Sequence, residues 1–125
     1  MDIETIHQFL TNSYWAKGRS RDLVARSIDG SFCVGLFLDK YQVGFARAVT
    51  DKVLFGYIFD VFILKEYRGR GWSRILLKTL LEHPDLKGIK WMLKTTDAGG
   101  LYEKFGFKPS KSSDGVYIRI NSAEP

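Results

Sequence analysis

Three strand-like segments joined by very short links constrain the fold of this chain more than any other feature. The segments "SFCVGLFL" (31–38), "VGFARAVT" (43–50) and "VLFGYIFDVFIL" (53–64) are rich in β-branched and aromatic residues. Only "DKYQ" and "DK" separate them, and links of that length join neighbouring strands that run in opposite directions. Residues 31–64 are therefore predicted to form an antiparallel meander.

After this meander the hydrophobic pattern changes to a helical period and then back to a strand. The segment "WSRILLKTLLEH" (72–83) places Trp72, Ile75, Leu76 and Leu80 on one face, and Pro84 ends the helix. A strand follows at 88–95. Such a strand–helix–strand crossover is right-handed and pairs its two strands in parallel, so the predicted sheet is mixed.

The remaining segments complete an α+β fold. Asp2 is a helix cap for residues 3–10 and Ser20 for residues 21–28, while 97–105 is predicted as a short helix and 115–120 as a last strand. The predicted order is ααβββαβαβ. A chain of 125 residues fits one domain, so we expect a single domain over residues 1–125.

Composition limits the expected partners and compartment of the protein but does not identify its function. The net charge of +5 favours anionic partners, although many soluble enzymes are mildly basic. Cys33 is the only cysteine, which suits a reducing compartment, and His7 and His83 lack metal-ligand spacing with it, so we expect no metal. The chain shows no signal pattern and no membrane-spanning run, so a cytoplasmic protein without membrane contact is expected.

The junction "YRGRGWSR" (67–74) joins the third strand to the helix at 72–83. A helix start exposes unpaired N–H groups, and glycines at 69 and 71 leave space for a phosphate to approach them. The nucleotide P-loop and the dinucleotide fingerprint both fail, because the lysine and a glycine at 74 are missing. The residues alone leave two interpretations open, a pyrophosphate cradle and a solvated arginine-rich loop.

This junction resembles the coenzyme A loop of the GNAT acetyltransferases, [RQ]-x-x-G-x-[GA]. Arg68 and Gly71 agree with the pattern, and Ser73 departs from Gly or Ala but is small. The segment "LYEKFGF" (101–107) is similar to the C-terminal signature of the family, and the resemblance covers roughly residues 30–108. It implies a GNAT-like acyl-CoA N-acyltransferase fold and an N-acetyltransferase that uses acetyl-CoA as cosubstrate.

The resemblance also implies roles for particular residues. A bulged strand would bind the pantetheine arm through its backbone, and the following loop would bind the pyrophosphate. Tyr102 corresponds to the general acid that protonates the leaving thiolate, and Thr95 stands where many relatives have a cofactor-binding Asn. The cofactor-binding positions are Val61, Phe62 and Ile63 on the strand and Arg68, Gly69, Arg70, Gly71, Trp72 and Ser73 in the loop.

Two parts of the chemistry stay open at this level. Asp60 or Glu66 is a candidate general base, a reaction without a base is the alternative, and a backbone N–H near Phe62 would hold the oxyanion. The segment 14–22, "YWAKGRSRD", would suit an anionic or aromatic acceptor, or it is a packed Trp15 with exposed charges.

These interpretations predict which partners the protein should have. The acceptor is expected to be a small-molecule or peptide amine, and a homodimer would help to close the site. A basic nucleic-acid-binding module is an alternative, but no aromatic platform or reading helix supports it, so nucleic acid is not expected. A CoA-binding domain without turnover is the other alternative.

Overall fold

Two compact units, Met1–Leu93 and Lys94–Pro125, divide the chain. The structure, a computed structural model, describes residues 1–95, 98–109, 117 and 119. The first unit contains the sheet and the helices α1, α2 and α3, and the second contains the short helix α4.

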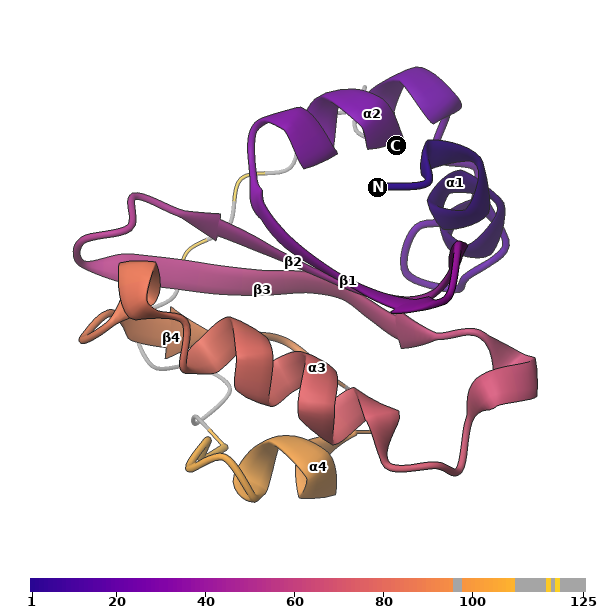
Figure 1. The fold of residues 1–125 in the computed structure, drawn as a ribbon. Coiled ribbons are helices and arrows are strands. Elements are labelled where there is room, and N and C mark those ends of the chain that lie inside the picture. The colour runs from indigo at the N-terminus through magenta and orange to yellow at the C-terminus, as the bar shows by residue number, and fades with distance from the viewer. Residues whose placement is uncertain (96–97, 110–116, 118, 120–125) are drawn as a thin grey trace. The chain divides into compact units, whose positions relative to one another are not determined.

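The first unit is built on a four-stranded mixed sheet with the strand order β1-β2-β3-β4 (Figure 1). Strands β1 (Phe32–Leu38), β2 (Tyr41–Thr50) and β3 (Phe55–Ile63) pair antiparallel, and β4 (Lys90–Met92) pairs with β3 in parallel. The predicted antiparallel meander and parallel crossover are both confirmed.

The turns shift two predicted strand boundaries. Tyr41 pairs with Leu38, so β2 begins two residues before the predicted start at 43, and Asp39 turns the chain with a φ of 55°. In the next turn the Asp51 carboxylate accepts the backbone N–H groups of residues 53, 54 and 55. These bonds hold Val53 and Leu54 in the turn, and the predicted strand start at 53 was therefore wrong.

Helices α1 (Ile3–Thr11) and α2 (Arg21–Asp29) cover one face of the sheet (Figure 1). Their predicted caps are confirmed, because Asp2 accepts the N–H of Thr5 and Ser20 accepts the N–H of Leu23. The core on this face joins the two helices and the segment between them to β2 and β3, through Ile6, Leu10, Ala16, Val24, Phe45 and Phe62.

Helix α3 (Trp72–Leu81) covers the opposite face of the sheet, after the short 3-10 helix η1 (Lys65–Tyr67) (Figure 1). It buries Leu76, Leu77 and Leu80, whereas Ile75 is 53% exposed, so the predicted apolar face was wrong at Ile75 and missed Leu77. A second 3-10 helix, η2 (Pro84–Leu86), leads to β4, where the Trp91 ring lies against Gly56.

In the C-terminal unit, α4 (Gly99–Glu103) continues into a tight turn. The carbonyl of Tyr102 accepts the N–H groups of Phe105 and Phe107, and the rings of Tyr102 and Phe107 meet edge to face. The predicted last strand at 115–120 lies outside the described residues, apart from 117 and 119.

The part of the chain that the structure describes contains neither a membrane-spanning helix nor a metal-binding cluster. No helix in these residues has both the length and the apolar character to cross a membrane. The same part of the chain contains no group of three or more His, Cys, Asp or Glu residues that could hold a metal ion.

Candidate active site

A β-bulge interrupts β3 at Asp60 and Val61. Phe45 pairs with Phe62 and Arg47 pairs with Phe59, so two residues of β3 lie opposite one residue of β2. Asp60 has a φ of 56°, a left-handed conformation that costs an ordinary residue about 1–2 kcal/mol and is common at bulges and functional sites. The family resemblance predicted a bulge in this strand, and the register confirms it.

Among the described residues the pairing of β3 with β4 ends at Tyr57 and Met92, so the edge of β3 beyond this bulge, called the open edge, has no strand partner in that part of the chain. Leu64 donates its N–H to the carbonyl of Val43, and N–H groups alternate in direction along a strand. Phe62 therefore turns its backbone groups to β2, as Leu64 does. Val61 and Ile63 turn theirs to the open edge, where an extended ligand could pair with them.

The loop after η1 gives the start of α3 an exposed, glycine-lined backbone. Gly69 and Gly71 have φ values of 79° and 77°, and a Cβ atom on either would meet no atom within 4 Å. Gly71 is the N-cap of α3 and provides no side-chain cap, so the first N–H groups of the helix lack that partner. Both observations fit a site where a phosphate group approaches the backbone.

The arginine side chains of this loop pack against the protein. Arg68 donates from Nε to the carbonyl oxygen of Ile63 at 3.0 Å and lies over the Phe9 ring. The guanidinium of Arg70 lies 5.6 Å and 5.3 Å from the ring centres of Tyr67 and Trp72. Both arginines are nevertheless exposed, so their side chains lie beside the glycine-lined backbone without being buried.

A buried ion cluster ties the bulge to the segment between α1 and α2. The Oδ2 atom of Asp60 accepts from Arg19 at 2.9 Å and from Arg47 at 3.0 Å, and Oδ1 accepts from Trp15 Nε1 at 3.0 Å. The Asp60 side chain is only 1% exposed. Buried carboxylates need such partners, and this one has three.

Sequence reasoning missed Arg19, Arg47 and Trp15 as partners of Asp60. Their separations in the chain are 41, 13 and 45 residues, and no local pattern reports contacts at such distances. The sequence does contain one indirect signal, which is an aspartate in the middle of an otherwise apolar strand. A carboxylate at such a position requires cationic or hydrogen-bonding partners.

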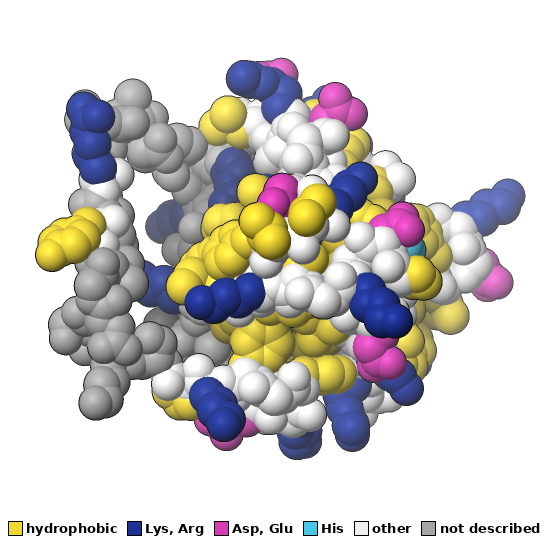
Figure 2. Space-filling view, turned by 90° about the vertical axis from the view of Figure 1, so that its left-hand side faces the viewer, with side chains coloured by type: hydrophobic (Ala, Val, Ile, Leu, Met, Phe, Trp, Pro, Cys, Tyr) yellow, Lys and Arg dark blue, Asp and Glu magenta, His cyan; other side chains and the backbone are white. Residues whose placement is uncertain are grey.

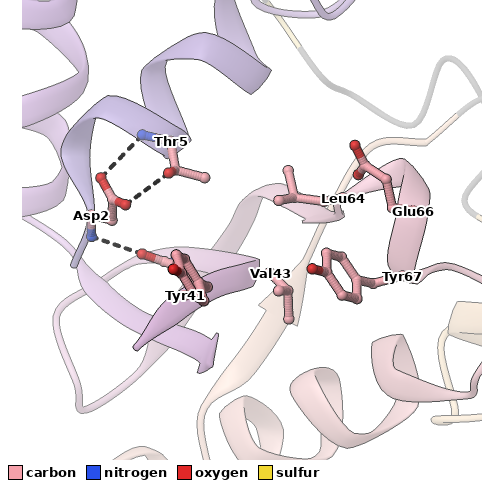
Figure 3. A pocket seen from close by; sticks show the side chains of 8 residues that line it. Asp2, Thr5, Tyr41, Val43, Leu64, Glu66 and Tyr67 are labelled. Carbon is pink, nitrogen blue, oxygen red and sulfur yellow. Dashed lines mark hydrogen bonds between the residues drawn. The ribbon is translucent and has the colours of Figure 1, made fainter. Parts of the chain in front are cut away.

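A pocket of about 290 Å³ lies at the end of β3 and the start of α1 (Figure 3). Two of its lining residues, Val43 and Leu64, join β2 to the end of β3, so the pocket lies over this strand pair and not at the open edge. Glu66 from η1 lines it and is exposed. The full lining is Asp2, Thr5, Tyr41, Gln42, Val43, Leu64, Glu66 and Tyr67.

Two predicted site residues belong to the C-terminal unit. Tyr102 lies on α4 and is 9% exposed. Thr95 accepts the N–H of Ala98, the N-cap residue of α4, through its hydroxyl at 3.1 Å. The first unit contains the other predicted residues: Asp60 and Val61–Ile63 on β3, Glu66 on η1, Arg68–Gly71 in the loop, and Trp72 and Ser73 in the first turn of α3.

On the face drawn in Figure 2, Lys and Arg side chains are spread among Asp and Glu side chains around a hydrophobic centre. A nucleic-acid surface commonly gathers its basic residues in one patch or stripe. This face therefore gives no support to the nucleic-acid-binding alternative.

Comparisons with known proteins agree on one family. The acetyltransferase (GNAT) domain family matches residues 29–109. A Gibberella zeae protein named as a candidate acetyltransferase is 30% identical over 93% of this chain and 78% of its own. A crystal structure of a candidate GNAT acetyltransferase from Xanthomonas campestris is 43% identical, with a TM-score of 0.92 over 97% of this chain and 87% of that chain.

The fold is also that of an enzyme named for its acceptor. Glucosamine-6-phosphate N-acetyltransferase from Arabidopsis thaliana has a TM-score of 0.65 over 94% of this chain and 89% of its own, at 18% identity. At this identity the likeness concerns the fold alone.

Proposed function

Because the chain belongs to the GNAT acetyltransferase superfamily, we propose that it moves the acetyl group of acetyl-CoA to a primary amine by direct attack in a ternary complex. The observation that carries this proposal is the open edge of β3 beyond its bulge, followed within a few residues by an uncapped helix start lined with glycine. One feature suits an extended arm with amide groups and the other suits its pyrophosphate.

Backbone groups do most of the cofactor binding in this proposal. The C=O of Val61 and the N–H of Ile63 pair with the pantetheine amides, and the carbonyl of Ile63 is not used because it already accepts from Arg68. The N–H groups at the start of α3, with Gly69, Gly71 and Ser73 allowing close approach, bind the pyrophosphate. Arg68, Arg70 and Trp72 shape this loop, and Thr95 is a further cofactor contact.

Acetyl-CoA supplies an activated carbonyl with a thiolate as leaving group. The N–H of Val61, turned to the open edge at the bulge next to Phe62, donates to the carbonyl oxygen as negative charge develops there. Tyr102 is the proposed general acid, since a tyrosine titrates at about 10 and therefore still carries the proton at neutral pH that the departing thiolate needs.

The two carboxylates predicted as a base have different surroundings. Asp60 is bound by three donors, and proton uptake there would break two ion pairs, so we assign it a positioning role. Glu66 is exposed and lines the pocket over β2 and β3, so as a base it would act through water. Direct attack by an amine that is already neutral remains the alternative to both.

Isothermal titration with acetyl-CoA tests the proposal, followed by turnover over a panel of amines. Binding with product formation supports it. A folded sample that binds no acetyl-CoA at high micromolar concentration would refute it, and salt-dependent retention of RNA or DNA by that sample would favour the nucleic-acid-binding module. Binding without any product would identify a CoA-binding domain without turnover.

A further inference from the structure

The two faces of the sheet give the acceptor and the cofactor different approaches to the open edge of β3. If the proposed function holds, the pyrophosphate lies at the start of α3, which covers one face (Figure 1). This arrangement leaves the opposite face, which α1 and α2 cover, for the approach of the amine to the thioester. The residues next to the bulge on that face are the ion cluster of Asp60 with Trp15, Arg19 and Arg47.

This cluster has more positive than negative charge. Two guanidinium groups, from Arg19 and Arg47, share the single carboxylate of Asp60, which leaves one positive charge without a carboxylate partner within the cluster. Arg47 is 9% exposed and uses Nη1 to bond the Ser31 hydroxyl, so its position is fixed from two sides. Charge held in such a partly buried place is screened less by water and salt than charge on the surface.

Arg19 has the donors that a ligand can still use. A guanidinium group has five N–H donors, and the ion pair with Asp60 engages Arg19 through Nη1. The Arg19 side chain is 20% exposed, so part of it reaches solvent beside the bulge. A planar guanidinium held in place by a carboxylate is well suited to bind a carboxylate or phosphate.

Aromatic rings line the same place. Trp15 is 41% exposed and is held by its bond to Asp60, and Phe59 is 37% exposed with Arg47 over its ring at 4.7 Å. Tyr57 lies beside Phe59, with ring centres 4.5 Å apart. The surface next to the bulge therefore combines a positive group with apolar rings whose positions are fixed.

We propose that the acceptor is a primary amine that also bears an anionic group, a carboxylate or a phosphate, and that Arg19, oriented by Asp60, binds that group. The inference rests on the proposed acetyl transfer and names its substrate class. A simple alkylamine is a cation at neutral pH and is repelled by the excess positive charge of the cluster. An added anionic group turns this repulsion into attraction and fixes the amine next to Val61, where the carbonyl oxygen is bound.

Acceptor pairs that differ only in the anionic group provide the test. Phenylalanine is compared with phenethylamine for the carboxylate, and O-phosphoethanolamine with ethanolamine for the phosphate. We expect kcat/KM to be about 10- to 100-fold higher for the anionic member of at least one pair, the range of a charged hydrogen bond. The pair that shows the difference identifies which anion the site accepts.

Arg19→Gln should abolish this preference and leave acetyl-CoA binding unchanged. Arg21→Gln is the matched control, because it removes the same charge two residues along the chain, where Arg21 pairs with Glu4 at the surface, 56% exposed. Binding of both acceptor pairs to the protein saturated with CoA is measured by calorimetry, so that the test does not depend on turnover alone. Circular dichroism verifies that both variants fold.

Three results would overturn the inference. The first is equal kcat/KM within both acceptor pairs, and the second is a preference that survives in Arg19→Gln. The third is a protein that binds acetyl-CoA but neither binds nor acetylates an anionic member. Each of these leaves acetyl-CoA binding intact, whereas failure of the proposed function appears as absent acetyl-CoA binding.

Discussion

Replacing Gly71 by alanine separates backbone strain from ligand binding at the start of α3. Gly71 has a φ of 77°, and an added Cβ would meet no atom within 4 Å, so the methyl group causes no clash in the free protein. The left-handed backbone alone costs an alanine about 1–2 kcal/mol. Gly88 has a φ of 81° and equally open surroundings, and it lies between η2 and β4. Gly88→Ala is therefore a control with the same strain.

The two substitutions should differ in their effect on the cofactor. In Gly71→Ala the methyl group stands where the pyrophosphate must approach the N–H groups of α3. Losing one charge-assisted hydrogen bond costs about 1.5–3 kcal/mol, so CoA should bind about 10- to 100-fold more weakly. Gly88→Ala should lose the same free energy of unfolding and keep the CoA affinity of the wild-type protein.

Urea unfolding measures the strain, and calorimetry with CoA and with pantetheine measures binding. Because pantetheine has no pyrophosphate, its affinity should be the same in Gly71→Ala as in the wild-type protein. A Gly71→Ala protein with unchanged CoA affinity would refute the phosphate cradle. Equal losses of CoA affinity in both variants would show that strain alone accounts for the effect.

Four further predictions concern other parts of the chain. Asp60→Asn leaves two guanidiniums without their carboxylate and should lower the free energy of unfolding by about 3–5 kcal/mol. The same substitution should raise the KM for the acceptor. Loss of one limb of the pH–rate profile would instead identify Asp60 as the base. Tyr102→Phe should lower kcat by about 10²- to 10⁴-fold with unchanged CoA affinity, and turnover that stays the same across pH would exclude the general acid. Burial raises the pKa of the Cys33 thiol from 9.0 to about 11, so at pH 8 a thiol reagent should react about 100-fold more slowly with the native protein than with the protein unfolded in urea. Equal reaction rates would contradict the burial of Cys33. Backbone N–H bonds from Val53, Leu54 and Phe55 lower the pKa of Asp51 below 3.8, so Asp51→Ala should lower the Tm at pH 7. The difference in Tm from the wild-type protein should shrink as the pH falls below 3.8. A difference in Tm that does not depend on pH would show that the charge of Asp51 is not responsible.

The sequence predicts the sheet well because its signals are local. β-Branched and aromatic runs with short links identify the meander, and the helix before Pro84 identifies the crossover, both of which the structure confirms. Boundaries fail where a single side chain decides them. The Asp51 carboxylate holds residues 53 and 54 in a turn, although both are apolar and would suit a strand.

The candidate site is predictable only in part. The glycine-rich helix start is visible in "YRGRGWSR" because helix ends and glycines have local signatures. The prediction of the bulge rested on the family resemblance, because nothing in the local sequence indicates that Asp60 adopts a left-handed backbone conformation. The cluster of Asp60 with Arg19 and Arg47 depends on tertiary contacts. The sequence therefore predicts Asp60 as a candidate base but does not reveal its two ion pairs.

Mass spectrometry of a reaction with isotopically labelled acetyl-CoA tests the central claim most directly. Direct attack in a ternary complex predicts one labelled acetyl group on the amine for each CoA thiol released, and no label on the protein at any time. A labelled protein that passes its acetyl group to the amine would contradict direct attack. Bound acetyl-CoA that yields no labelled amine from any acceptor would contradict acetyl transfer itself.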